Sequence, residues 1–349
     1  MRVYQIDPVK DARWSEFIGL QRNASVFHSM GWLEALRSTY GYDPVVFTSS
    51  SASDELSNGV LFCKVHSWIT GSRLVSLPFS DHCELLCDSK EDLAFLIRYL
   101  QTCMEHENFR YLEVRPVNGN FGQISETIGF RPLATYYLHV LDLRRKLDEL
   151  FKTFDRNSVQ RRIQRAERAG LIEKCGRSDD LLRDFYALFV RTRGRHRLPP
   201  SPYRWFRNLV RHSGEAVEIR VAYRAKTPIA ALLTLRFRET VYYKYGCSDA
   251  QFHKLGAMPW LLWKAIASAQ SNAASHFDMG RTEEQNAGLL AFKNHWVCQP
   301  QALVYWRFPA AASLNSPGDW KLQVAKRIFS TMPGGLRTVA GNLLYRHIG

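Results

Sequence analysis

The chain has 349 residues, of which 46% are hydrophobic and 13% aromatic, and it carries a formal net charge of +14 at pH 7. This composition excludes a disordered chain, and the length is enough for about two domains that each bury a core. The N-terminal MRVYQIDPVKDARW lacks the apolar run of a signal peptide, and no stretch of about 18 apolar residues is present to span a bilayer. We therefore expect a protein that is made and kept in the cytoplasm.

Seven cysteines, an odd number, are scattered from Cys63 to Cys298, which is typical of reduced core residues rather than of a disulfide framework. His82, Cys83 and Cys87 lie close together but lack the paired CxxC spacing of a zinc site. We expect buried or loop thiols at these positions and no bound metal.

The first half of the chain contains an ordered run of predicted elements between Asp43 and Asp142, preceded by a helical stretch at Ser29–Tyr40. Three β-rich segments with short turns predict a meander, and a helix, a strand, a helix and a last strand follow. In chain order the segments are DPVVFTSS, NGVLFCKV, RLVSLPFS, KEDLAFLIRYLQTCMEHE, YLEVRP, FGQISETIG and RPLATYYLHVLDL.

A helical stretch at Leu147–Gly170 contains five arginines and opens the basic part of the chain. Residues 144–211 hold 19 Lys and Arg against 8 Asp and Glu, whereas residues 1–143 hold 12 against 17. Arginines at this density suit bidentate contacts with phosphates, and a solvated helix face is the equally weighted alternative. The anionic partner could be a nucleic acid, a nucleotide-linked sugar or a lipid headgroup. The candidates for anion binding are Arg161, Arg162 and Arg165.

The second half repeats the same order of elements between Ala216 and Pro309, after a helical stretch at Leu181–Val210. Its segments are AVEIRVAYRA, PIAALLTLRF, TVYYKYGCS, a helix from about Ala257 to Ala274, SHFDMG, AGLLAFKNHW and QALVYWRF. The repeated order is that of an N-acetyltransferase-type (GNAT) domain. The sequence therefore predicts an α/β (α+β) fold of two tandem GNAT-like domains, each a mixed, mostly antiparallel sheet flanked by helices.

The predicted limits are residues 1–145 for the N-terminal domain, 146–170 for an arginine-rich connecting helix, 171–310 for the C-terminal domain and 311–349 for basic amphipathic helices. In the last part, WKLQVAKRIF and LRTVAGNLLYRHIG each place apolar residues on one helical face. Such helices could lie on an anionic membrane, at the inner face of the cytoplasmic membrane, or pack on the second domain. Packing is the favoured interpretation.

Chemistry in a GNAT-type domain is expected where the central strands diverge after the meander, because a free backbone N–H there can polarise a carbonyl and the next helix offers N–H groups to phosphates. Here this region is Tyr245–Pro259. Users of acetyl-CoA carry a Gln/Arg-x-x-Gly-x-Gly/Ala loop at this point, whereas this chain has the right residue types at a different spacing. The cofactor-binding candidates are Gln251, Lys254, Gly256 and Ala257.

The equivalent loop of the first half, SDHCELLCDSKED, contains no glycine and several acidic residues, so we expect it to hold no phosphate. The first domain is therefore expected to shape an acceptor site or to serve as a scaffold. Its candidate substrate-binding residues are Asp81 and His82.

Segments spread over nearly the whole chain resemble the FemABX-like peptidyltransferases and the related BioF-like acyltransferases of the GNAT superfamily. In the second half these are YYKYGCSD, LLWKAI, HFDMGR and LLAFKNHW. Upstream, VFHSMGWLEALRSTYGYDP, LPFSDHCELL, RNSVQRRIQRAERAGL and FYALFVRTRGRHRLPPSPYRWFRNL, with the closing LLYRHIG, resemble the branch found in exopolysaccharide gene clusters.

The resemblance implies transfer of an aminoacyl or acyl group to an amine. FemABX enzymes take the amino acid from aminoacyl-tRNA and add it to a peptidoglycan precursor. Their Phe-Lys pair matches Phe292-Lys293, where the lysine is thought to hold a phosphate or the developing oxyanion. We expect this pair to open toward the strand ends near Tyr245, although Lys293 could instead be an exposed helix residue.

Further positions of the family match this chain. Tyr243 and Tyr245 match a Tyr-x-Tyr-Gly strand whose hydroxyls can bind donor or acceptor, unless they are core aromatics. Asp278 and Arg281 match a strand-end pair of the family. Asp278 could be a general base or the structural partner of Arg281, and the structural pair is the favoured interpretation.

One position departs from the family. The peptidoglycan enzymes carry an Arg-x-x-x-Tyr pair that grips the acceptor, and here it reads Ser201-x-x-x-Trp205, unless Arg204 or Arg207 substitutes. Trp205 remains a substrate-binding candidate, but a peptidoglycan acceptor is not supported at this position.

Three hypotheses follow. The first is an N-acyltransferase or aminoacyltransferase that acts on a sugar- or peptide-amine of a cell-envelope or exopolysaccharide precursor, carried by a lipid or a nucleotide. The second is an N-acetyltransferase that uses acyl-CoA on a soluble amine. The third is a non-catalytic GNAT-like adaptor on RNA or anionic membrane. The donor is thus an acyl-CoA or an aminoacyl-tRNA.

Overall fold

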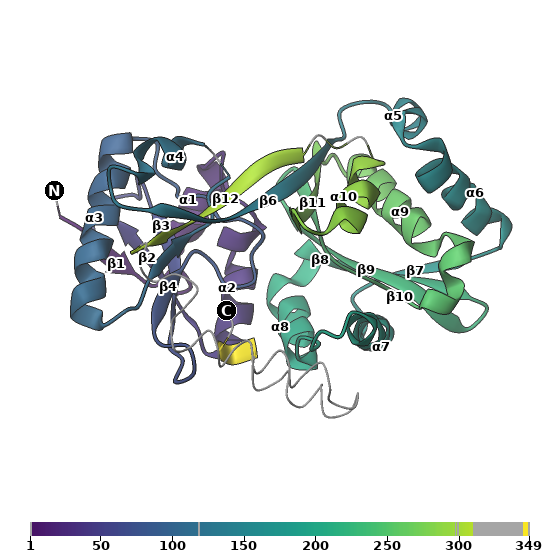
Figure 1. The fold of residues 1–349 in the computed structure, drawn as a ribbon, viewed down its shortest axis with the longest axis horizontal. Helices are drawn as coiled ribbons and strands as arrows, with labels where there is room; N and C mark the ends of the chain where they lie inside the picture. The colour runs from purple at the N-terminus through teal and green to yellow at the C-terminus, as the bar shows by residue number, and fades with distance from the viewer. Residues whose placement is uncertain (1, 118, 297, 299, 310–344, 348–349) are drawn as a thin grey trace. The chain divides into compact units, whose positions relative to one another are not determined.

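The computed structural model describes residues 2–117, 119–296, 298, 300–309 and 345–347 (Figure 1). The chain divides into two compact units, of which unit 1 comprises Met1–Thr135 with Leu303–Gly349 and unit 2 comprises Tyr136–Ala302. Among the described residues, no helix is both long and apolar enough to cross a bilayer.

The strands of unit 1 follow the order β1-β2-β3-β4-β5-β12. All the neighbours are antiparallel except β4 and β5, which are parallel. The predicted strand RLVSLPFS is shorter than expected, because the chain leaves the sheet after Val75. The strands are β1 (Tyr4–Ile6), β2 (Asp43–Thr48), β3 (Val60–Val65), β4 (Arg73–Val75), β5 (Leu112–Val114) and β12 (Pro300–Phe308).

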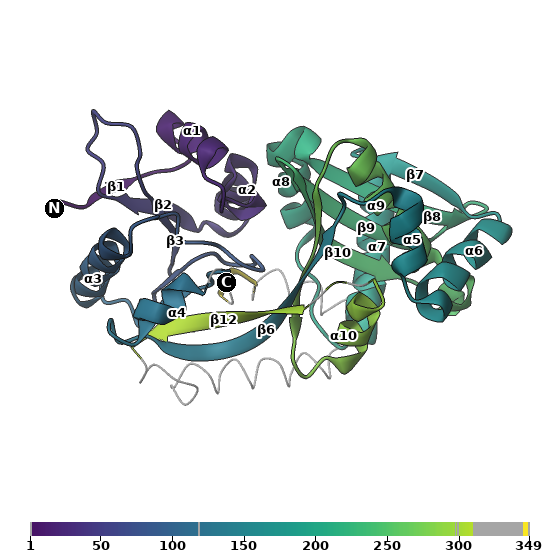
Figure 2. The same cartoon turned by 90° about the horizontal axis from the view of Figure 1, so that it is seen from above.

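Helices cover both faces of the strands of unit 1, with α1 and α2 on one face and α3 and α4 on the other (Figure 2). The face under α3 and α4 forms one apolar core with β2, β3, β4 and β5. Helix α3 begins where the Ser89 side chain accepts the N–H of Asp92, and it ends at Asn108 in the left-handed conformation, with φ of 54°. The helices are α1 (Ala12–Leu20), α2 (Met30–Tyr40), α3 (Lys90–Glu107) and α4 (Asn120–Ser125).

The strands of unit 2 follow the order β6-β11-β10-β9-β8-β7, antiparallel except for β10 and β11, which are parallel. The edge strand β7 was not predicted, because none of its five residues is buried and it carries no apolar alternation. The strands are β6 (Arg131–Asp142), β7 (Ile172–Gly176), β8 (Val217–Arg224), β9 (Thr227–Phe237), β10 (Thr240–Ser248) and β11 (His276–Glu283).

Helices also cover both faces of unit 2, with α7 and α8 on one face and the others on the opposite face (Figure 1). Because it is covered on both sides, the central strand β9 is buried continuously from Ile229 to Leu235. The helices are α5 (Leu147–Thr153), α6 (Arg161–Arg168), α7 (Asp179–Arg195), α8 (Tyr203–Ser213), α9 (Ala257–Ser271) and α10 (Ala287–Asn294).

The repeated element order is confirmed, but each repeat exchanges its last strand. The last strand predicted for the first repeat, β6, pairs with β11 of unit 2 through contacts such as Asp278 with Val140. The last strand of the second repeat, β12, pairs with β5 of unit 1, as Arg307 does with Glu113. The chain therefore passes from unit 1 to unit 2 after residue 135 and returns to unit 1 after residue 302, whereas the sequence predicts limits at 145 and 310.

Two predicted helical stretches are each more than one helix. Leu181–Val210 contains α7 and α8, because Pro199, Pro200 and Pro202 interrupt it. Leu147–Gly170 contains α5, a π-helical turn at Arg156–Gln160 and α6. The break falls at Asp155, whose carboxylate accepts the N–H groups of Asn157 and Ser158.

The arginine-rich segment is part of unit 2 rather than a free connection. Ile163 and Ala166 of α6 are buried in the same apolar core as α9. The predicted C-terminal amphipathic helices lie outside the described residues except for Tyr345–His347, which belong to unit 1.

We predict that Phe121→Ala destabilises unit 1 by about 3–5 kcal/mol, because Phe121 is 1% exposed and packs edge-on against Phe130 and the exchanged strand's Trp306. Urea denaturation measures the change. Leu20→Ala, at a side chain that is 84% exposed, is the control and should change the free energy of unfolding little. Equal effects of the two substitutions would contradict the packing of β12 into unit 1.

Candidate active site

In unit 2 the parallel strands β10 and β11 pair at one end only. The paired residues are Thr240 with His276, Val241 with Phe277 and Tyr242 with Asp278. Beyond Tyr242, β10 continues to Ser248 alongside β9, while β11 continues alongside β6. The two strands therefore diverge at their carboxyl ends, as expected from the sequence.

A bulge lies where β10 leaves β11. Tyr243 is opposite Thr234 and Tyr245 is opposite Leu233, so Lys244 is the extra residue. In a regular strand, Tyr243 and Tyr245 would point to the same face because they are two residues apart. The bulge turns their side chains to opposite faces. Tyr243 packs against the core under α9, and Tyr245 contacts Phe206 of α8.

Tyr243 is a core aromatic. Its hydroxyl lies over Gly246, where a Cβ would overlap it, and burial raises the pKa of this phenol well above its usual value. Tyr245 is the tyrosine with a polar partner, since the indole N–H of Trp205 donates to its hydroxyl at 2.9 Å. The structure thus brings together two residues that the sequence identified separately.

A pocket of about 210 Å³ lies at the end of β10 and the start of α9. Three predicted site residues line it, namely Arg162 of α6, Ala257 of α9 and Phe292 of α10. The remaining lining residues were not named as candidates individually, although most of them lie in the predicted region Tyr245–Pro259. They are Ile229, Ala230, Ser248, Asp249, Phe252, His253, Met258 and Pro259.

The loop before α9 differs from an open phosphate cradle. It forms a 3-10 helix, Ala250–Leu255, in which the N–H of Gln251 donates to the Asp249 carboxylate and that of Gly256 to the His253 carbonyl. Helix α9 carries Pro259 at its third position, so one of its first N–H groups is missing. Fewer backbone donors remain for a phosphate than the sequence led us to expect.

Gly256 also has a packing reason for being glycine. Its φ is +77°, and a Cβ would overlap the backbone carbonyl of Arg162. The close approach at Gly256 is therefore that of helix α6 and not that of a ligand. Nearby, the Arg165 guanidinium donates to the carbonyl of Lys254 at 3.2 Å, which ties α6 to the loop.

His253 is the histidine that lines the pocket. Its Nε2 lies 2.9 Å from the Ser248 hydroxyl. The pKa of this imidazole is lowered by burial and by the positive charges of Arg195 and Arg162, and the carboxylate of Asp249 opposes this shift only in part. A neutral imidazole at the edge of the pocket can accept a proton at neutral pH.

Lys293 is buried, so the alternative interpretation of this lysine as an exposed helix residue is wrong. Only 2% of it is exposed, and its ammonium donates to the carbonyls of Gly280 at 2.7 Å and Arg281 at 3.1 Å. These carbonyls belong to a second bulge, where the pairing of β11 with β6 shifts between Asp278 and Arg281. Phe292 reaches the pocket, whereas the Lys293 ammonium holds the bulge of β11.

Asp278 and Arg281, which the sequence suggests as a structural pair, each make a further contact at this bulge. The Asp278 carboxylate is buried and accepts the N–H of Gly280 at 2.6 Å. The Arg281 guanidinium lies over the ring of Tyr136, 4.3 Å from its centroid. Asp278 therefore stabilises the bulge through the backbone, at Gly280, whose φ is +72°.

His139 of β6 completes this buried polar cluster. Its Nε2 lies 3.0 Å from the Asn294 side-chain oxygen, next to Lys293 in sequence. Burial and the nearby Lys293 charge lower the pKa of His139, and its hydrogen bond to the Asn294 oxygen opposes this shift, so the imidazole is neutral at neutral pH. Lys293, Asp278, His139 and Asn294 together position the strand that borders the divergence.

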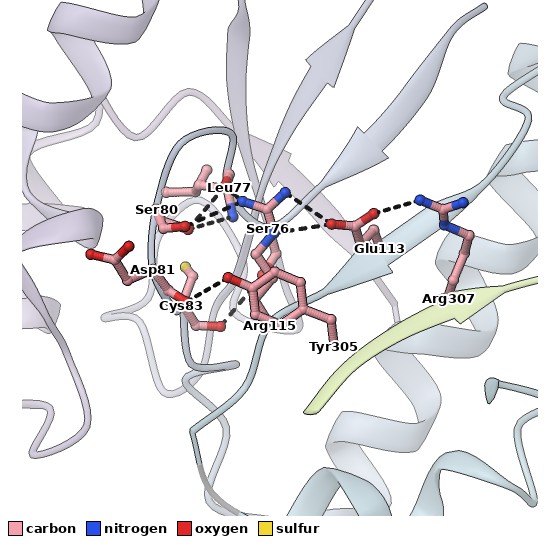
Figure 3. Close-up of polar contacts among 9 residues, drawn as sticks. All are labelled: Ser76, Leu77, Ser80, Asp81, Cys83, Glu113, Arg115, Tyr305 and Arg307. Atoms are coloured by element: carbon pink, nitrogen blue, oxygen red, sulfur yellow. Dashed lines mark hydrogen bonds and ion pairs between the residues drawn. The ribbon is translucent and has the colours of Figure 1, made fainter. Parts of the chain in front are cut away.

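Unit 1 has the same strand divergence, but its own chain fills it (Figure 3). Strands β4 and β5 pair at Leu74 with Leu112 and at Val75 with Glu113, and the loop that follows β4 then enters. The N–H of Cys83 donates to the Arg115 carbonyl at 2.8 Å, and the Arg115 guanidinium donates to the Leu77 carbonyl.

A buried ionic cluster holds this loop in place. Glu113 accepts from Arg115 at 2.9 Å and from Arg307 of β12 at 2.9 Å (Figure 3). Burial raises the pKa of Glu113, but the two guanidinium groups outweigh it and hold the pKa below its usual value. The hydroxyl of Tyr305 donates to the Asp81 carbonyl at 2.6 Å.

The predicted substrate residues of unit 1 sit in this loop. His82 is buried edge-on against Phe27, with ring centroids 5.2 Å apart, and Asp81 is partly exposed. The divergence of unit 1 is thus occupied by Leu77–Cys83, which fits a scaffold more closely than a donor site.

The remaining predicted anion site is only partly assembled. Arg162 reaches the pocket and Arg165 holds the loop, but Arg161 is exposed and donates to the Asn157 side chain at 2.7 Å. Sequence reasoning missed His253, although it lies inside the loop singled out for phosphate binding. It also missed His139, because nothing in the pattern of β6 marks this residue.

Residues 154–294 match the family model of the acetyltransferase (GNAT) domain. They therefore form an acyltransferase domain of this type, and the protein is an acyltransferase. No curated protein matches the sequence.

Solved structures share the fold over most of the chain. FemX has a TM-score of 0.68 at 14% identity, covering 87% of this chain and 97% of FemX. L-PGS from Bacillus licheniformis has a TM-score of 0.59 at 12% identity, covering 93% and 98%. A tandem GNAT protein from the clavulanic acid biosynthesis pathway has a TM-score of 0.57 at 9% identity, covering 88% and 97%. At these identities the similarity concerns the fold.

We predict that Lys293→Met destabilises unit 2, contrary to what an exposed lysine would imply. Each buried carbonyl left without a donor costs about 1–3 kcal/mol, and Lys293 serves those of Gly280 and Arg281. Urea denaturation measures the change. Lys226→Met, in the exposed turn between β8 and β9, is the matched control and should leave the stability unchanged. A fully stable Lys293→Met protein would contradict the positioning role.

Proposed function

We propose that unit 2 transfers an aminoacyl group from aminoacyl-tRNA to an amine of a cell-envelope or exopolysaccharide precursor. The observation that supports this best is the divergence of β10 and β11 beside the pocket that contains Phe292, His253 and the start of α9. The choice of acceptor rests on the sequence resemblance. We further propose that the reaction takes place in the cytoplasm, where both substrates would be supplied.

The transfer proceeds as an amine attack on an ester carbonyl. The carbonyl oxygen is polarised by a backbone N–H of β10 beyond Tyr242, where β11 no longer pairs. The new C–N bond forms as the C–O bond to the ribose breaks. His253 accepts the proton that the amine loses, and the departing ribose oxygen takes up a proton.

The loop before α9 favours an aminoacyl-tRNA donor over acyl-CoA. A pyrophosphate needs several free backbone N–H groups, and here those of Gln251 and Gly256 are bonded within the loop while Pro259 has none. The Asp249 carboxylate also lines the pocket and would repel a doubly charged group. A single ribose with its ester needs no such cradle.

The distribution of charge favours the same donor. Residues 144–211 carry a net charge of +11, and α8 presents Arg204, Arg207 and Arg211 on one exposed face. Arginines in this arrangement attract a polyanion much larger than the pocket, which a tRNA is and a CoA thioester is not.

Binding of the two donors to the full chain tests the proposal. We expect a labelled aminoacyl-tRNA to bind saturably in filter binding, and acetyl-CoA to leave the melting temperature unchanged. Stabilisation by acetyl-CoA without tRNA binding would favour the acyl-CoA alternative. Binding of tRNA that is insensitive to its aminoacyl group, with no transfer to any amine, would favour a non-catalytic adaptor.

We predict that Arg162→Gln weakens donor binding about tenfold, because it removes a charged donor that lines the pocket. Arg168→Gln, on the same helix but bonded to the Gln164 carbonyl and absent from the pocket lining, is the matched control. Filter binding at two salt concentrations measures both variants. Equal losses would reduce the role of Arg162 to general surface charge.

We predict an acidic limb in the pH dependence of turnover. Because the pKa of His253 is lowered, its basic form is lost only as the pH falls below the value of about 6.5 usual for histidine. His253→Gln should remove this limb and reduce turnover on the order of a hundredfold. His106→Gln, at an exposed histidine of unit 1, should leave the profile unchanged. An unchanged limb in His253→Gln would assign the proton to another group.

A further inference from the structure

Three residues near the end of the chain, Tyr345–His347, are held by unit 1, to which they belong. The residues that contact it come from three separate stretches of the sequence. These are Tyr42 between α2 and β2, the stretch from Ser67 to the first residue of β4, Arg73, and Phe79 in the loop after β4. More than 260 residues separate the segment from any of them.

Side-chain donors bind the backbone of this segment. The hydroxyl of Tyr42 lies 3.1 Å from the carbonyl oxygens of both Tyr345 and Arg346 and donates to them. Thr70 donates its hydroxyl to the carbonyl of His347 at 2.9 Å, and the Arg73 guanidinium donates to the same oxygen at 2.9 Å.

The donors form a built site rather than a surface contact. Both Tyr42 and Arg73 are 2% exposed, and Arg73 also donates to the Thr70 hydroxyl at 2.6 Å. The cost of burying these polar groups is offset only if their donors find acceptors, and three successive carbonyls of the segment supply them.

Unit 1 also contacts two side chains of the segment. The ring of Tyr345 lies 5.8 Å from that of Phe79, which stacks in turn on Tyr42 at 6.2 Å. The imidazole Nδ1 of His347 lies 3.0 Å from the Ser67 hydroxyl, and its ring meets Trp68 edge-on at 5.6 Å. Backbone donors combined with places for an aromatic ring and an imidazole are typical of peptide recognition.

We propose that unit 1 carries a peptide-binding site whose resident ligand is the chain's own Tyr345–His347 segment. The ligand class is a short peptide with the pattern Tyr-x-His, read through its carbonyls and these two side chains. The segment acts on the filled divergence of unit 1 through Phe79, which precedes Asp81 and His82 and has a φ of 60°. For a residue other than glycine, this conformation needs support from its surroundings. The proposal is independent of the donor chemistry of unit 2.

The site binds the neutral form of His347. Burial and the charges of Arg346 and Arg73 lower the pKa of this imidazole. Because the bound pKa is below that of a free histidine, binding is at full strength above about pH 6.5 and is lost as the pH falls. The charged groups that act on the ring are Arg73 at the start of β4 and Arg346 from the segment, and both oppose its protonation.

A labelled peptide, LLYRHIG, added to the full-length chain tests the proposal by fluorescence anisotropy. In the wild-type chain the resident segment competes, so we expect weak binding. In the full-length Tyr345→Ala/His347→Ala variant, whose own segment is weakened, we expect the peptide to bind at least tenfold more tightly.

Variants of the site provide the controls. Tyr42→Phe and Thr70→Val, added to the Tyr345→Ala/His347→Ala chain, each remove one hydroxyl that binds a carbonyl and should reduce peptide affinity about tenfold. Thr102→Val, which removes an exposed hydroxyl on α3 bonded to the Arg98 carbonyl, should change nothing. Circular dichroism establishes that each variant is folded.

The pH provides a second readout that a general loss of folding would not reproduce. The wild-type peptide should bind several-fold more weakly at pH 5.5 than at pH 7.5, whereas a peptide with His347→Gln should bind with little pH dependence. The proposal is overturned if the Tyr345→Ala/His347→Ala chain does not bind the peptide, or if it binds no more tightly than the wild type. Affinity that survives both Tyr42→Phe and Thr70→Val would also overturn it.

Discussion

The proposed activity depends on the early end of one backbone pairing. Strands β10 and β11 are hydrogen-bonded only as far as Tyr242 and Asp278, and each then follows a different neighbour. Backbone N–H and C=O groups that lose their strand partner need another one, and a polarised carbonyl satisfies an N–H. The pocket lies at the end of β10 and the start of α9, and a bulge interrupts the pairing of each diverging strand, at Lys244 in β10 and between Asp278 and Arg281 in β11.

Unit 1 meets the same constraint in a different way. Strands β4 and β5 also diverge, but the loop Leu77–Cys83 enters the space, and Arg115 holds it by donating to backbone carbonyls. The buried carboxylate of Glu113 neutralises part of the charge of two arginines, one of which comes from the exchanged strand β12. Two units of one topology therefore carry an open site and a filled site.

Much of the architecture follows from local patterns. The meander of each half, the helix from Ala257 and the strand before Asp278 carry strong periodicity, and their order alone identifies the fold. The exchange of β6 and β12 carries no local signal, because a strand's sequence does not specify which of two similar edges it joins. The position of the unit boundaries was missed for the same reason.

The candidate site was less predictable than the fold. Phe292, Ala257 and Arg162 were identified from three separate patterns, and they line one pocket because their elements converge on the end of β10. The Lys293 ammonium points to the bulge of β11, and this bulge arises from the pairing of β11 with β6. Because the pairing is not encoded in the residues around Lys293, the sequence does not distinguish a buried lysine from an exposed one. The role of Gly256 was equally hard to predict, because the sequence does not distinguish a glycine required for helix packing from one required for phosphate binding.

Mapping of a photoreactive donor analogue tests most directly that unit 2 alone holds the acyl group. An aminoacyl-adenosine amide with a diazirine in its acyl chain would be cross-linked to the full-length protein, and the labelled peptides identified by mass spectrometry. We expect saturable labelling of residues 242–258 and 289–294, at the end of β10 and on α10, with none in residues 76–83 of unit 1. Labelling of residues 76–83, or equal labelling of both units, would contradict the assignment of an open site to unit 2 and a filled one to unit 1.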